Sequence, residues 1–323
     1  MNNKMKKRTI TGVAIISGAI LVSVGVAGTV HLINENNAIE AKTYVTAKEN
    51  NFNASTVTKE VNGITYALND SDYSATVISI VPPTSGSSKI IGESKDGKSI
   101  FVNIPQSVTV NNTYTVRYIG DGSNSLFASN FEQYCSFLSK KQVNVILPKT
   151  VYSVSANAFK KSSTITTINV VNVSNTTTFA NQQNANLTIC GVSGSGAENG
   201  AINNRFSDMY SYDKNDTKKT AKITGFSSAA LGIFNYLPDG VTVNFEIPTF
   251  ISSGKYISTS IADNAFANKK FMKTLIIPGT VNSVGVGAFG GCSNINWVKF
   301  LGKNTSVSDN AFFEDTIDKI YAL

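Results

Sequence analysis

Apolar side chains recur along this chain at a fixed spacing that neither an isolated helix nor an isolated strand explains. Three Ala-Phe pairs end at Phe266, Phe289 and Phe312, each 23 residues from the last. Apolar residues follow each phenylalanine by 9 and 11 positions, as Val298 and Phe300 do for the middle pair. Residues two apart lie on the same side of a strand, so the pattern predicts one strand in every unit.

A fourth phenylalanine and a recurring proline extend this pattern toward the N-terminus. Pro148 and Pro278 each lie 11 residues before a phenylalanine, Phe159 and Phe289, and Pro248 begins a unit with seven extra residues. Proline is tolerated best where a strand ends. A unit of this length cannot bury its own apolar side, but stacked units can. The sequence therefore predicts a β-rich solenoid with about 23 residues per unit, a parallel sheet on one face, and the repeated phenylalanines in one buried column.

The segment IPGTVNSVGVGAFGGCSNINWVKF, residues 277–300, resembles the repeat of BspA-like leucine-rich-repeat surface proteins. That repeat runs roughly I-P-x-x-V-x-x-I-x-x-x-A-F-x-x-C-x-x-L-x-x-I. Residues 147–170 and 260–277 are similar to it, and residues 304–323 diverge more. The resemblance implies an extracellular leucine-rich-repeat solenoid used for binding and adhesion.

Two departures from the family pattern stand out. Cys292 alone occupies the cysteine position of the repeat. Residues 171–243 contain one recognisable, decayed unit, from Ile223 to Leu237, with Ala-Leu in place of Ala-Phe. We therefore expect a solenoid over residues 101–323 with an irregular middle at 171–243.

The N-terminal part of the chain predicts export. A basic stretch from Lys4 to Arg8 precedes 22 residues without charge, Thr9 to Val30. About 20 such residues span a bilayer as a helix. Residues 1–33 are therefore a signal peptide, which is removed, or a signal anchor, which crosses the membrane. Residues 34–60 are polar and are expected to be a tether. Either alternative predicts an extracellular or cell-surface protein.

Residues 61–100 are expected to form an N-terminal β cap. From Val61 to Ile80 apolar and polar residues alternate on both sides of the turn sequence NDSD. This alternation predicts a β-hairpin that covers the start of the solenoid. The glycine-rich segment from Gly191 to Asn204 is expected to be a flexible loop.

Charge changes this picture little. The net charge is +7, and without residues 1–41 the chain holds 24 Lys and Arg against 19 Asp and Glu. These charges are scattered, which argues against a nucleic-acid partner, and they permit weak attraction to anionic cell-surface polymers. The three cysteines, Cys135, Cys190 and Cys292, lack metal-ligand spacing and are expected to be buried hydrophobes.

The sequence offers no recognisable catalytic, cofactor or metal site. The single histidine, His31, lies in the export segment, so no histidine is left for a Ser-His or Cys-His mechanism or for a histidine metal site. Carboxylate pairs occur in any protein of this size. A carboxylate-based enzyme therefore stays open as a third function, and we interpret the chain as not an enzyme.

The predicted ligand-binding surface lies on the outward positions of the last three units, where strand side chains point away from the core. Exposed aromatic residues beside cations are typical binding hot spots. In the alternative, Trp297 packs against a neighbouring loop and only stabilises the sheet. The predicted residues are Ile276, Trp297, Tyr321, Lys273, Lys299 and Lys319.

The function that follows is extracellular binding or adhesion, with a protein or glycan on a host or neighbouring cell as the partner. The first alternative is a self-assembling structural component of the cell envelope. In both cases the N-terminal segment contacts the membrane if it is not cleaved.

Overall fold

The computed structural model describes residues 13–16, 19–22, 57–83, 88–174, 177–180, 182, 184–201, 204–252, 254–313, 315 and 319–322. The chain divides into two compact units, Met1–Lys48 and Glu49–Leu323. In the first unit, β1 (Val13–Ile16) and β2 (Ala19–Val22) pair antiparallel. The rest of the expected export segment, His31 and residues 34–56 of the expected tether lie outside the described residues. No helix among those described is both long and apolar enough to cross a membrane.

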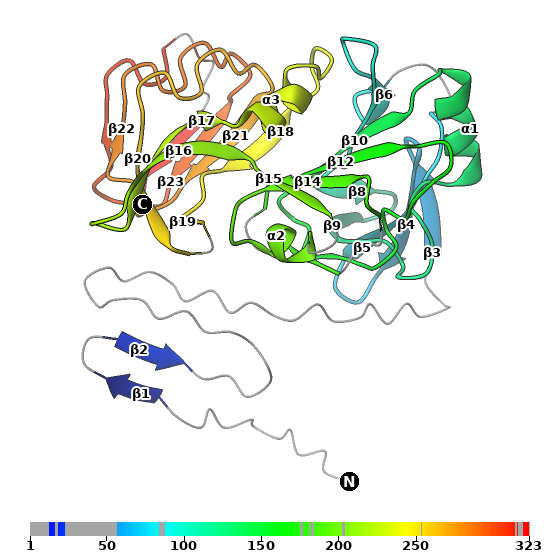
Figure 1. Ribbon diagram of the computed structural model, residues 1–323, viewed down its shortest axis with the longest axis horizontal. Helices are drawn as coiled ribbons and strands as arrows, with labels where there is room; N and C mark the ends of the chain where they lie inside the picture. The colour runs from blue at the N-terminus through cyan, green and yellow to red at the C-terminus, as the bar shows by residue number, and fades with distance from the viewer. Residues whose placement is uncertain are drawn as a thin grey trace. The chain divides into compact units, whose positions relative to one another are not determined.

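The second unit begins with a half, residues 57–208, that is built from two sheets (Figure 1). In sheet I, all neighbours from β7 to β15 pair in parallel, and β6 pairs antiparallel with β7. Its strands, in spatial order, are β15 (Arg205–Asp208), β14 (Leu187–Gly191), β12 (Thr167–Asn172), β10 (Gln142–Leu147), β7 (Ile100–Asn103) and β6 (Ile91–Glu93).

Sheet II of this N-terminal half joins the expected hairpin to short parallel strands. The hairpin region forms three antiparallel strands, and the last of them, β5, pairs in parallel with β9. A short strand, β8 (Ser107–Thr109), pairs antiparallel with β9. The strands in order are β13 (Thr178–Phe179), β11 (Ser153–Val154), β9 (Thr113–Ile119), β5 (Ser74–Ile80), β4 (Ile64–Asn69) and β3 (Val57–Val61).

The C-terminal half, residues 209–322, repeats this plan. Sheet III starts with an antiparallel pair and continues in parallel, and β19 (Phe250–Ile251) pairs antiparallel with β20. Its strands are β16 (Tyr210–Asn215), β17 (Thr220–Phe226), β20 (Tyr256–Ile261), β22 (Ser283–Val284) and β24 (Ser306–Val307). Sheet IV is parallel throughout, with β18 (Val243–Glu246), β21 (Met272–Ile277), β23 (Trp297–Phe300) and β25 (Lys319–Ala322).

The predicted parallel sheet is present, but the prediction of a sheet on one face was incomplete. Each half has two sheets, because the segment after each proline also pairs with its equivalent in the next unit. The Ala-Phe turns add a third ladder: the N–H of Phe266 donates to the carbonyl of Ala288 (2.7 Å), and that of Phe289 to Ala311 (2.8 Å). Buried backbone groups need such partners in the absence of water. Successive units are thus hydrogen-bonded on three sides.

The spacing between units differs between the two halves. In sheet IV the register advances by 23 residues, from Thr274 to Trp297. In sheet I it advances by 25 residues from Val143 to Ile168 and by 19 from Ile168 to Leu187. The shorter units of the N-terminal half are the reason that residues after 171 escaped recognition in the sequence.

The phenylalanines form two groups, so the prediction of a single column was wrong. Phe266, Phe289 and Phe312 stack with ring centroids 5.2 and 5.0 Å apart and nearly parallel planes. Phe159 belongs to the separate core of the N-terminal half, where it lies 6.5 Å from Phe127. The antiparallel pair β16–β17 starts a second stack of units, and this restart separates the two cores.

Three helices replace or accompany the turns. In α1 (Ser129–Phe137) the buried side chains are Phe131 and Cys135. In α3 (Ser228–Phe234) they are Ala230, Ile233 and Phe234, consistent with the decayed unit expected there. The expectation of a flexible loop after Gly191 was wrong, because α2 (Gly196–Gly200) packs closely on β13. A Cβ atom on Gly196 would lie 2.0 Å from the carbonyl oxygen of Thr177, so glycine permits this approach.

Polar side chains complete the last turns of the N-terminal half. The N–H of Phe159 donates to the side-chain oxygen of Gln182 (3.1 Å) instead of to a following Ala-Phe turn. The carbonyl of Phe159 accepts from the amide of Asn184 (2.8 Å). Both amide side chains are buried. They supply the hydrogen bonds that another unit would otherwise provide.

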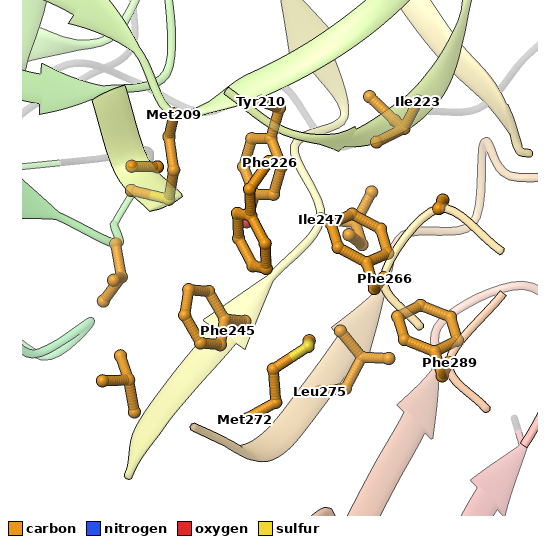
Figure 2. Close-up of a cluster of buried hydrophobic side chains, with 14 of the residues drawn as sticks. Met209, Tyr210, Ile223, Phe226, Phe245, Ile247, Phe266, Met272, Leu275 and Phe289 are labelled. Atoms are coloured by element: carbon orange, nitrogen blue, oxygen red, sulfur yellow. The ribbon is translucent and has the colours of Figure 1, made fainter. Parts of the chain in front are cut away.

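The outward face of sheet I is buried at the carboxyl ends of its strands. Phe101, Ile146, Val171 and Cys190 belong to the hydrophobic core of the C-terminal half. This core centres on Phe226, whose ring lies 5.5 Å from Tyr210, 5.0 Å from Phe245 and 4.8 Å from Phe266 (Figure 2). Sheet I therefore has a core on both faces and covers the apolar start of the second stack of units.

Candidate binding surface

The outward face of sheet IV carries the residues that the sequence singled out. Side chains alternate along its strands: Leu275 and Val298 are buried, and Ile276, Trp297 and Lys299 are half-buried. This alternation follows from the pleat, which points successive side chains to opposite faces. The structure thus places the predicted outward residues of β21 and β23 outside the core.

The backbone register arranges these positions in two rows across the strands. In the first row Thr274 pairs with Trp297, which pairs with Lys319. In the second row Ile276 pairs with Lys299, which pairs with Tyr321. Neighbouring strands lie about 4.8 Å apart, so each row extends about 10 Å over three strands. A lysine position therefore separates Ile276 from Tyr321 in the second row, and the expected continuous apolar patch becomes a mixed apolar and cationic surface.

Lys273 reaches this surface through an irregularity in the sheet. Val243 pairs with Met272, but Asn244 pairs with Thr274, which leaves Lys273 as an extra residue between them. The extra residue of a bulge turns its side chain away from the regular alternation. Lys273 is exposed, at the amino end of β21. It borders the first row instead of belonging to it.

Two residues that sequence reasoning missed also belong to the surface. Glu246 on β18 pairs with Ile276 and extends the second row. Burial lowers the pKa of Lys149, the negative charge of Glu246 opposes this, and the positive charge of Lys299 adds to it. Lys149, which follows β10, therefore lies near both residues. Glu246 was detectable as the outward residue before Ile247-Pro248, but only tertiary packing brings Lys149 to this place.

The first row is extended by a polar pair. The hydroxyl of Thr274 donates to the side-chain oxygen of Asn244 on β18 (2.8 Å). Asn244 and Glu246 are both half-buried. Beyond Trp297 and Ile276 the face thus becomes polar, and its charges at Glu246, Lys149 and Lys299 lie together. Such a surface is suited to a ligand with apolar and anionic parts.

The cysteines have a packing role. Cys135, Cys190 and Cys292 are unpaired and buried, as expected. Burial raises the pKa of each thiol to about 12, which keeps the thiols protonated at neutral pH and therefore unreactive. Within the part of the chain that the structure describes, no cluster of three or more His, Cys, Asp or Glu side chains is arranged to hold a metal ion.

Comparison with protein families identifies two repeat regions. Residues 129–198 and 259–322 match the BspA type leucine rich repeat region, in six copies. The first segment runs from α1 to α2, and the second includes most of β20 and all strands from β21 to β25. The resemblance found in the sequence is thus confirmed. Among curated protein sequences, none matches the chain.

Two solved structures are similar. A leucine-rich repeat protein from Bacteroides capillosus ATCC 29799 aligns with 36% of this chain and 94% of its own, at 17% identity and a TM-score of 0.25. The pneumococcal vaccine antigen PcpA aligns with 75% of this chain and 70% of its own, at 12% identity and a TM-score of 0.20.

Proposed function

From the premise that this chain carries BspA-type leucine-rich repeats, we propose that it is an extracellular binding and adhesion protein without enzymatic activity. Its ligand is a protein or glycan on a host or neighbouring cell. The observation that carries the proposal is the contrast between the two parallel sheets. The outward apolar residues of sheet I are buried in a core. Those of sheet IV, Ile276 and Trp297, are half-buried.

Two finer features of the fold belong to the same proposal. The strands β3, β4 and β5 act as an N-terminal cap, and the 23-residue unit is the building block of the C-terminal half. The outer strand β3 supports the first point, since it is exposed along most of its length and carries Lys59 and Glu60. Charged residues on an edge strand prevent pairing with other chains. The register between Thr274 and Trp297 supports the second.

The proposed location is the cell surface or the extracellular medium, reached through the N-terminal hydrophobic segment. If the segment is retained as an anchor, the basic stretch from Lys4 to Arg8 stays inside the cell. Protease added to intact cells is then expected to remove residues 42–323, as detected with an antibody against the solenoid. Protection of that region in intact cells, with digestion after lysis, would contradict the proposed location.

Replacement of Trp297 by alanine is expected to weaken ligand binding by about 2 kcal/mol or more, because large aromatic residues beside charges dominate interface energies. The same change is expected to lower the free energy of unfolding by about 1 kcal/mol or less, since half of the side chain is already outside the core. Affinity is measured by titration of the ligand, and stability by chemical denaturation.

The matched control for this change is Phe137→Ala on α1. Phe137 is 85% exposed, so this variant removes an aromatic ring that lies outside the proposed surface. It is expected to bind as the parent does. A large loss of stability in Trp297→Ala with unchanged binding would mean that the tryptophan is a packing residue and that the ligand binds elsewhere.

A second candidate function, a self-assembling envelope component, is favoured by the end of the C-terminal half. β24 and β25 are the last strands of sheets III and IV, and no described strand pairs with their outer edges. Val307, Phe313 and Ile320 are exposed there. Unpaired edges with exposed apolar residues promote association between chains. An assembling subunit is expected to elute at rising apparent mass as its concentration increases.

A further inference from the structure

A turn between two strands concentrates the positive charge of this protein. The end of the β16–β17 hairpin and the neighbouring turn before β20 carry five lysines and two aspartates, Asp213 and Asp216. This gives a local net charge of +3, compared with +5 for all of residues 42–323. We call residues 213–222 with Lys255 the lysine hairpin. Its lysines are Lys214, Lys218, Lys219, Lys222 and Lys255, all exposed.

Tyrosine rings hold two of these lysines in place. The Nζ of Lys214 lies 5.1 Å from the ring centroid of Tyr212 and 5.2 Å from that of Tyr256. The Nζ of Lys219 lies 5.8 Å from the ring centroid of Tyr256. The hydroxyl of Tyr256 donates to Asp216, which fixes this ring in turn. The ammonium groups are therefore ordered before any ligand binds, which reduces the entropy cost of binding.

The aspartates neutralise only part of this charge. The ion pairs Lys219–Asp216 and Lys222–Asp213 have N–O distances of 3.9 and 3.8 Å, and their side chains are more than half exposed. Such pairs are weak in water. No described carboxylate forms an ion pair with Lys214, Lys218 or Lys255. Most of the cationic capacity of the lysine hairpin is thus available to a polyanion.

A polar depression of about 310 Å³ adjoins the lysines. This is the lower end of the volume range of ligand sites. The depression has amide, hydroxyl, ammonium and carboxylate groups, which hydrogen-bond to sugar hydroxyls as donors and acceptors. Its polar lining comes from β16, β17 and β20 and consists of Asp213, Lys214, Asn215, Thr220, Lys222, Thr259 and Ser260.

We propose that the lysine hairpin binds an acidic polysaccharide through its sulfate or carboxylate groups. This site is separate from the outward face of sheet IV and does not depend on it. A membrane surface fits less well, because none of the exposed large hydrophobic side chains of the described residues lies in the hairpin. Single-stranded nucleic acid fits less well, because bases need open aromatic faces and lysines already lie over Tyr212 and Tyr256.

The test measures binding of the purified full chain to immobilised heparin, a sulfated polysaccharide, and to hyaluronate, a carboxylated one, at about 150 mM salt. We expect saturable binding to at least one of them, and the two arms show which anion is recognised. The triple variant Lys218→Gln/Lys222→Gln/Lys255→Gln keeps the ring contacts of Lys214 and Lys219. It is expected to bind about tenfold more weakly, which corresponds to a few weak charge contacts.

The matched control is Lys160→Gln/Lys161→Gln/Lys303→Gln, which removes the same charge from three exposed lysines outside the hairpin. It is expected to change the affinity less than threefold, roughly the effect of long-range charge alone. Circular dichroism confirms that both variants are folded. Equal losses in both triple variants would overturn the proposal, as would no binding to either polysaccharide. Equal binding to oligo-dT or to phosphatidylserine vesicles, with the same loss in the hairpin variant, would assign the site to nucleic acid or to membranes.

Discussion

Val171→Asp is expected to lower the free energy of unfolding by about 4–5 kcal/mol, which is enough to unfold a marginally stable protein. Val171 lies on the outward face of sheet I and is 0% exposed, because the core of the C-terminal half covers it. A carboxylate at this place loses its hydration, and no cation among the members of that cluster replaces it. Urea denaturation followed by circular dichroism measures the effect.

Thr167→Asp is the matched control for this prediction. Thr167 lies on the same strand, β12, and on the same face, but it is half-buried instead of fully buried. The control is expected to change stability by about 0.5 kcal/mol or less, as is usual for surface positions. A small effect of Val171→Asp, similar to the control, would show that the outward face of sheet I is open to water. The contrast between sheets I and IV would then be lost.

Phe289→Ala is expected to lower the free energy of unfolding by about 3–5 kcal/mol, the usual range for removing a buried aromatic ring. Phe289 is fully buried and stacks between Phe266 at 5.2 Å and Phe312 at 5.0 Å. Truncation removes contacts with both neighbours and leaves a cavity between successive units. Thermal and chemical denaturation of the purified protein measure the effect.

Phe313→Ala provides the comparison for the stacked ring. Phe313 follows the last stacked phenylalanine directly and is 57% exposed, so its loss is expected to cost about 0.5–1 kcal/mol. The sequence alone does not say which ring of the pair Phe312-Phe313 continues the stack. An equal melting temperature for Phe289→Ala and the parent would mean that the register of the three Ala-Phe turns is wrong.

The C-terminal units were predictable because their period is regular. A constant interval places equivalent residues at equivalent heights, so the Ala-Phe pairs and the alternation at Val298 and Phe300 predict parallel strands and a buried stack. The same reasoning placed Trp297 and Lys299 on the outward face. Their exact neighbours were less predictable, because the bulge at Lys273 shifts the pairing with β18 by one residue.

The relation between the two halves was not predicted, although part of its signal is in the sequence. β10 and β12 contain almost continuous apolar runs, QVNVIL and TINVVN. Runs of this kind are typical of strands that are buried on both faces. The partner that buries them, the cluster around Phe226, forms only because β16 and β17 restart the stack as an antiparallel pair. This restart has no counterpart in the 23-residue pattern.

The candidate surface was predictable residue by residue but not in its composition. The outward positions of a strand follow from its inward ones, so Ile276 and Trp297 were accessible to sequence reasoning. Lys149 was not, because it comes from the N-terminal half and reaches Glu246 and Lys299 through tertiary packing. The lysine hairpin was present in the sequence as YSYDKNDTKKTAK. Its excess charge was averaged out when charges were counted over the whole chain.

The central claim, that this solenoid binds a ligand through the outward face of sheet IV, is tested most directly by probing glycan and protein arrays with residues 42–323 and with the same fragment carrying Trp297→Ala. The account predicts that the fragment stays monomeric, binds a restricted set of ligands in a saturable way, and loses this binding on substitution while remaining folded. Self-association without ligand binding, or ligand binding that Trp297→Ala leaves unchanged, would contradict it.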